Sequence, residues 1–123
     1  MSNFLDMMLK PEVESVKNAL PTAKYEIKRL SKLAGEKVVV ELHALPYGKT
    51  QQLREMEQDQ EIHILLAGCS ELSDSALTQK FGGATPAETV KAMLLPGEIA
   101  DLSRAVERLT GYRKTTIAEV KND

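Results

Sequence analysis

The chain has 123 residues, which suits a single domain, and its 42% apolar and 28% charged residues are the usual mix of a globular protein. Its 16 basic and 18 acidic residues give a net charge of -2, which argues against generic binding to nucleic-acid phosphates. No apolar run approaches the roughly 18 residues that span a bilayer, and the first residues do not resemble a secretion signal, so we expect a cytoplasmic domain.

Residues 1–21 are predicted to form a flexible or docking N-terminal arm that Pro21 closes. Part of it has helical spacing, but such a helix is too short to be stable alone. It therefore docks on the domain's own core, docks on a partner or stays mobile. Methionine suits a docking surface because its unbranched side chain repacks against varied partners. The candidate partner-binding residues share one side of this helix: Phe4, Leu5, Met8 and Leu9.

An antiparallel β-hairpin is predicted next, because apolar and polar residues alternate with a period of two along residues 24–30 and 38–45. The loop between them, 31–36, places Gly35 where a positive φ is needed. His43 lies on the second strand without a second metal ligand at a neighbouring position. We therefore interpret it as a residue of the strand face.

The remainder of the chain is helical in character. Residues 47–58 are rich in helix formers, with Leu53 and Met56 on one face. The apolar stretch 61–69 suits a buried helix or an added strand equally. We favour the helix because no turn residue separates this stretch from the helix before it.

Capping signals divide the following segment. Ser73 is placed to cap a short helix that stops at Gly82-Gly83. Thr85 and Glu88 form a capping box with proline at the first helical position, which predicts a helix that ends at Pro96-Gly97.

The last predicted helix runs from about Glu98 to Thr110 and ends at Gly111. A second capping box, Thr116 to Glu119, starts at most a marginal turn, so the C-terminal end is expected to be frayed or docked. The predicted core draws on all these elements: Ile27, Val38, Val40, Leu53, Leu65, Phe81, Val90, Leu94, Ile99, Leu102, Val106 and Leu109.

Together these elements predict an α+β fold, in which an N-terminal antiparallel β-hairpin packs against a mostly helical C-terminal bundle. We expect one domain over residues 22–112, between the arm 1–21 and a C-terminal tail, 113–123.

The sequence shows none of the common catalytic motifs. The chain has no glycine motif for nucleotides, no nucleophile elbow and no zinc-protease motif, and its carboxylates are scattered among basic residues. Cys69 lies in an apolar stretch, where burial makes a thiol inert, and a catalytic role would need His43 or His63 as its base. We therefore expect no enzyme, no cofactor and no metal site.

DNA binding is an alternative, because residues 73–95 predict a short helix, a glycine turn and a second helix, as in a helix-turn-helix. The second helix, over 86–95, offers Lys91 as its one cation. Recognition helices usually contribute several Arg, Lys, Asn or Gln side chains. A helix-turn-helix regulator is therefore the less favoured interpretation.

Over roughly residues 22–121 the chain resembles the phage XkdN-like tail assembly chaperones. The most specific likeness is the block Leu-Leu-Pro-Gly-Glu-Ile at 94–99, which is followed by a helix and a Gly-Tyr pair. The blocks that carry the resemblance keep their order along the chain: 25–31, 44–47, 64–68, 81–88, 94–99 and 109–112.

The resemblance implies a non-enzymatic phage or prophage protein of the host bacterial cytoplasm. Such a chaperone would bind the long tape measure protein, keep it soluble and help the tail tube protein assemble around it. Self-association is left open, and no nucleic acid, membrane or small-molecule substrate is expected as a partner. A structural tail component or a generic protein-interaction module is the runner-up.

Overall fold

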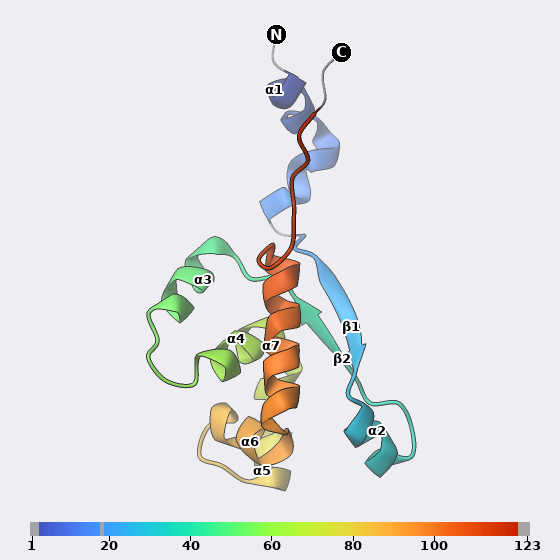
Figure 1. Cartoon of the computed structure of the whole chain (residues 1–123), viewed down its shortest axis with the longest axis vertical. Coiled ribbons are helices and arrows are strands. Elements are labelled where there is room, and N and C mark those ends of the chain that lie inside the picture. Colours follow the sequence, from blue (N-terminus) through green and yellow to red (C-terminus); the bar gives the residue numbers. More distant parts are fainter. Residues whose placement is uncertain (1–2, 18, 121–123) are drawn as a thin grey trace.

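The protein is described by a computed structural model that covers residues 3–17 and 19–120 (Figure 1). Helix α7 runs through the middle of the domain, and both α4 and strand β2 pack against it. The elements, with η for 3₁₀ helices, are α1 (Asn3–Met8), η1 (Pro11–Lys17), β1 (Thr22–Glu26), α2 (Lys28–Ala34), β2 (Val39–His43), α3 (Tyr47–Arg54), α4 (Gln60–Gly68), η2 (Ser70–Ser73), α5 (Ser75–Phe81), α6 (Pro86–Met93) and α7 (Pro96–Thr110). The predicted α+β class is confirmed.

The predicted hairpin is present as an antiparallel pair of strands. β1 and β2 align from Thr22 opposite His43 to Glu26 opposite Val39. Successive side chains of a strand point to opposite faces of the sheet. In β2, accordingly, the buried Val40 and Leu42 alternate with the exposed Val39 and Glu41.

The strands are shorter than predicted, and their connection contains a helix instead of a plain loop. The ladder closes with a hydrogen bond from the Ile27 amide to the Val38 carbonyl. The Val38 amide then donates to the Ser31 hydroxyl at 2.9 Å, which holds the turn of α2 beside the strand. Gly35 ends α2 with a φ of 78°, so the positive φ predicted there is confirmed.

Helices α3 and α4 occupy the next predicted segments, and the helical interpretation of 61–69 is confirmed. Leu53 is buried as expected, but Met56 lies beyond the end of α3 and is exposed. At the end of the helix the Leu53 carbonyl accepts hydrogen bonds from the Met56 amide at 3.2 Å and from the Gln60 side-chain amide at 3.0 Å.

The cap of α5 differs from the prediction by one residue. Ser73 belongs to η2, and the carboxylate of Asp74 accepts a hydrogen bond from the Ala76 amide at 2.8 Å. Both residue types are good caps, so the sequence did not separate them. At α6 the predicted cap is confirmed, because the Thr85 hydroxyl accepts from the Glu88 amide.

Helix α7 begins at Pro96, two residues before the predicted start. Pro96 and Gly97 were interpreted as a break between helices, but they form the first turn of α7. Proline is well placed at this position because its missing amide hydrogen would have had no partner in the helix. Gly111 ends α7 with a φ of 104°, as predicted.

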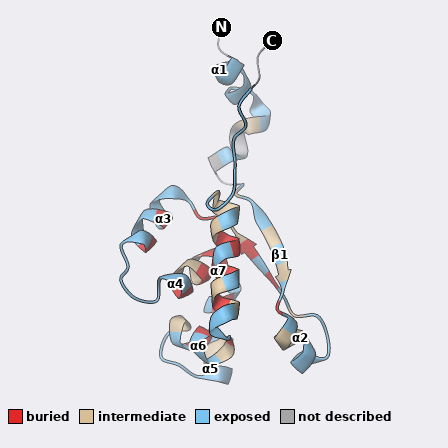
Figure 2. Cartoon of the chain, in the orientation of Figure 1, coloured by how far each residue is buried: buried red, intermediate tan, exposed pale blue. Residues whose placement is uncertain are grey.

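Most of the predicted core is buried, and Figure 2 shows it gathered around β2, α4 and α7. Phe81 is the clear error: its side chain is 45% exposed at the end of α5, with the Lys80 ammonium 5.2 Å from its ring centre. Val38 and Leu109 are only half-buried. Core members that the prediction lacked are Leu42, Ala44, Leu45, Ile62, Leu72 and Ala105.

The second capping box, at Thr116 to Glu119, does not start a helix. These residues are extended and exposed, and so are the side chains of Ile117 and Val120. A turn here would have no apolar surface to pack against, and local propensity alone does not hold so short a helix.

Candidate protein-binding surfaces

The four candidate binding residues of the arm share one exposed helix. Phe4, Leu5, Met8 and Leu9 are 68, 56, 40 and 80% exposed, and none of the described residues of α1 is buried. The hydrogen bond from the Leu9 amide to the Leu5 carbonyl continues the helical pattern to Leu9. Figure 1 places α1 beyond the C-terminal end of α7, away from the buried core. In the structure, therefore, this arm does not cover the core.

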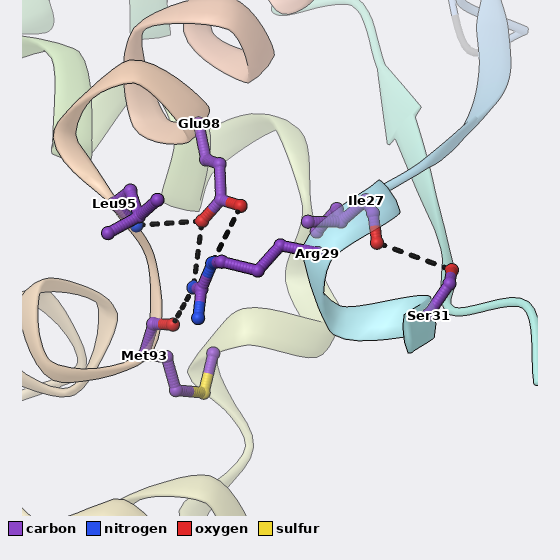
Figure 3. A network of polar contacts seen from close by, with 6 residues as sticks. All are labelled: Ile27, Arg29, Ser31, Met93, Leu95 and Glu98. Carbon is purple, nitrogen blue, oxygen red and sulfur yellow. Dashed lines mark hydrogen bonds and ion pairs between the residues drawn. The ribbon is translucent and has the colours of Figure 1, made fainter. Parts of the chain in front are cut away.

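The Leu-Leu-Pro-Gly-Glu-Ile block has a structural role that centres on Glu98 (Figure 3). One carboxylate oxygen of Glu98 accepts from the Leu95 amide at 2.7 Å and caps α7. Both oxygens accept from the Arg29 guanidinium, at 2.9 and 3.0 Å, and Arg29 also donates to the Met93 carbonyl. This pairing with Arg29 holds the pKa of the Glu98 carboxyl below its ordinary value.

Glu98 and Arg29 therefore connect two of the sequence blocks described above. Arg29 lies on α2 between the strands, and Glu98 lies in the first turn of α7. A bidentate pair of this kind fixes orientation as well as distance. The ion pair between these two blocks therefore holds α2 against the start of α7.

Cys69 is fully buried, as the sequence predicted, and burial raises the pKa of its thiol. The His43 ring is hydrogen-bonded to the neighbouring residue: its Nδ1 lies 3.0 Å from the Ala44 carbonyl oxygen. Within residues 3–17 and 19–120, no group of three or more His, Cys, Asp or Glu side chains is arranged to hold a metal ion.

The polar side chains of α6, the candidate recognition helix, bind other parts of the domain. The Lys91 ammonium pairs with the Asp59 carboxylate at 3.0 Å. Thr89 is buried, and its hydroxyl bonds the Gly82 and Thr85 carbonyls. Lys91 therefore forms a surface ion pair, and the Thr89 hydroxyl is used inside the domain.

Two hollows on the domain were not predicted from the sequence. A cleft of about 320 Å³ lies between α3, α4 and the end of α7, with Leu45, Leu53 and Ile64 among its lining residues. An apolar groove of about 250 Å³ lies between the hairpin and α5, and Phe81 forms part of its wall. Neither has a signal in the sequence, because each combines elements that are distant along the chain.

Comparison with known protein families finds the phage XkdN-like tail assembly chaperone family over residues 57–122, which is more than half of the chain. The chain belongs to this family. The resemblance given by the sequence blocks is thereby confirmed. No curated protein and no solved structure matches the chain.

The match covers α4 to α7, which is the helical half of this tail assembly chaperone. Proteins of this family act in phage tail assembly, so the partners of the chain are tail assembly proteins. Among the described residues, no helix is long and apolar enough to cross a membrane. The N-terminal arm lies outside the matched residues, and its role has to be argued from its own chemistry.

Proposed function

We propose that this chaperone is non-enzymatic and binds the tape measure protein of the phage tail in the cytoplasm of the host bacterium. It assists assembly of the tail tube protein around that client. The family supports a role in tail assembly. The arm residues Phe4, Leu5, Met8 and Leu9 are the proposed contact surface.

The observation that carries this proposal is the exposed apolar face of α1. A chaperone must hold apolar segments of its client and release them later. A short amphipathic helix that packs only on its partner binds reversibly, because part of the binding energy is spent on ordering it. Met8 beside the aliphatic residues adds a side chain that adapts to different client segments.

Copurification from cells that express both proteins tests this proposal. The variant with Phe4→Ser and Leu9→Ser removes the two most exposed side chains of the set. We expect it to retain the wild-type melting temperature and to lose about tenfold or more of the tape measure protein that copurifies, since each apolar side chain contributes about 1.5–3 kcal/mol when fully buried.

Leu33→Ser on α2 is the matched control, because Leu33 is a similarly exposed aliphatic residue elsewhere on the domain. Equal copurification by both variants would show that the arm is not the contact surface. Failure of the wild-type chain to retain the tape measure protein would overturn the proposed client itself. Presence of the chain in purified finished tails would instead favour a structural component.

We also infer the domain limits given above, with the folded domain at 22–112. In support, the buried apolar residues run from Ile27 to Val106, and the described residues before Ile27 and after Val106 are exposed or half-buried.

A further inference from the structure

The cleft between α3, α4 and the end of α7 combines an apolar floor with a cationic rim. Leu45 and Leu53 are buried at its base, and Ile64 packs beside them. Arg54 stands at the rim, at the end of α3. A volume of about 320 Å³ has room for one or two large apolar side chains.

Arg54 supplies a positive charge at this cleft. Its guanidinium carbon lies over the Tyr112 ring, 4.8 Å from the ring centre. A guanidinium group can donate two parallel hydrogen bonds to a carboxylate. No ion pair among the described residues involves Arg54, whereas the neighbouring Arg113 is bound to Glu107 at 2.9 Å. The cleft therefore suits an apolar side chain with a carboxylate close to it.

Helix α1 carries such a combination. Leu9 is 80% exposed, and Asp6 lies three residues before it, so the two side chains are neighbours on the helix surface. Asp6 also takes part in no ion pair among the described residues. The chain's own α1 stands beyond the end of α7 (Figure 1). None of its described residues lines the cleft.

We infer that two copies of this chain exchange their arms, so that Leu9 of each copy enters the cleft of the other and Asp6 pairs with Arg54. Arm and cleft both lie at the end of the domain where α7 stops. A two-fold arrangement then forms the same contact twice. This dimer does not depend on the identity of the client, and a client that binds the arm would compete with it.

Sedimentation equilibrium of the full chain alone tests the exchange by charge reversal. Asp6→Arg and Arg54→Asp each place like charges together at two contacts, and we expect each to raise the dimer Kd about tenfold or more. The variant with both changes restores opposite charges and should return to near the wild-type Kd. Arg104→Asp, on an exposed part of α7 outside the cleft, is the control and should change nothing.

A wild-type chain that stays monomeric at every attainable concentration would overturn the inference. A dimer that neither single change weakens, or that the double change fails to restore, would show that another surface joins the copies. Melting temperatures of all variants verify that they are folded. Because no tape measure protein is present, a negative result here leaves the proposed client untouched.

Discussion

Glu98 holds three parts of the molecule with one carboxylate. It caps α7 through the Leu95 amide, pairs with Arg29 on α2, and brings Arg29 within 2.8 Å of the Met93 carbonyl at the end of α6. A charge that accepts this many hydrogen bonds is more stable in the folded chain than in the unfolded one, which is why its pKa is lowered.

Glu98→Gln should therefore destabilise the domain in a pH-dependent way. A lowered pKa contributes stability that is fully present above the ordinary glutamate value, about 4.3, and is lost as the pH falls through the lower folded value. We expect the melting temperature of the variant to lie a few degrees below wild type at pH 7 and to approach wild type near pH 3. Arg29→Gln should show the same convergence, and a difference that is constant with pH would contradict this account.

Gly68 is required by close packing rather than by backbone conformation. A Cβ atom here would lie 2.6 and 2.7 Å from the two methyl carbons of Val106. Valine is β-branched and cannot easily turn these methyls away, so α4 would have to shift on α7. We expect Gly68→Ala to lower the free energy of unfolding by about 1–3 kcal/mol, as measured in urea.

Gly97→Ala in the first turn of α7 is the matched control. A Cβ atom there meets nothing within 4 Å, and the backbone is helical. Alanine should be neutral or should add up to about 1 kcal/mol. If both variants unfold at the same urea concentration, close packing of α4 on α7 is not the reason that position 68 requires glycine.

At the scale of elements, α7 is the central support of the fold. Its buried stripe includes Leu102 and Val106, and it packs against both α4 and β2. Val106→Asp or Leu102→Asp buries an unpaired charge and should abolish cooperative thermal unfolding at neutral pH. Arg104→Asp, on the exposed side of the same helix, should keep the transition. A normal melting curve for Val106→Asp would contradict the assignment of Val106 to the buried face of α7.

The sequence predicted correctly those features that depend only on residues close together in the chain. The period of β2, the Thr85 cap and the glycine at 111 each act within a few residues, so the sequence contains the whole signal. The start of α7 was misplaced because a Pro-Gly pair both ends and begins helices, and here Pro96 begins one.

Other features depend on residues far apart in the chain. Helix α2 is held by a pair between Arg29 and Glu98, which are 69 positions apart, and no local pattern at 28–34 reveals that partner. The sequence marked the apolar face of the arm, but not where the arm lies or what cleft could receive it. The cleft rim depends on Arg54 lying over Tyr112, which only the folded chain brings together.

At the scale of the whole molecule, the apolar side chains that fill the core around α7 are separate from those of the two terminal segments. The described apolar residues of α1, and Ile117 and Val120 in the C-terminal tail, are exposed, and Figure 2 shows these segments exposed along most of their length. The unfolding of the domain and the binding of its arms are therefore separable properties. Substitutions of the buried residues of α7 should affect both, whereas substitutions in α1 should affect binding alone.

Limited proteolysis in dilute solution tests this separation, together with the proposed domain limits. Lys17 is the last residue of η1, and Lys114 follows the end of α7, whereas Lys91 and Arg104 lie within helices of the domain. Cleavage needs local unfolding, which costs least in segments that bury nothing. We expect trypsin to cut after Lys17 and Lys114 well before it cuts after Lys91 or Arg104, as followed by intact mass. Equal rates at all four sites would show that the arms are as firmly folded as the domain.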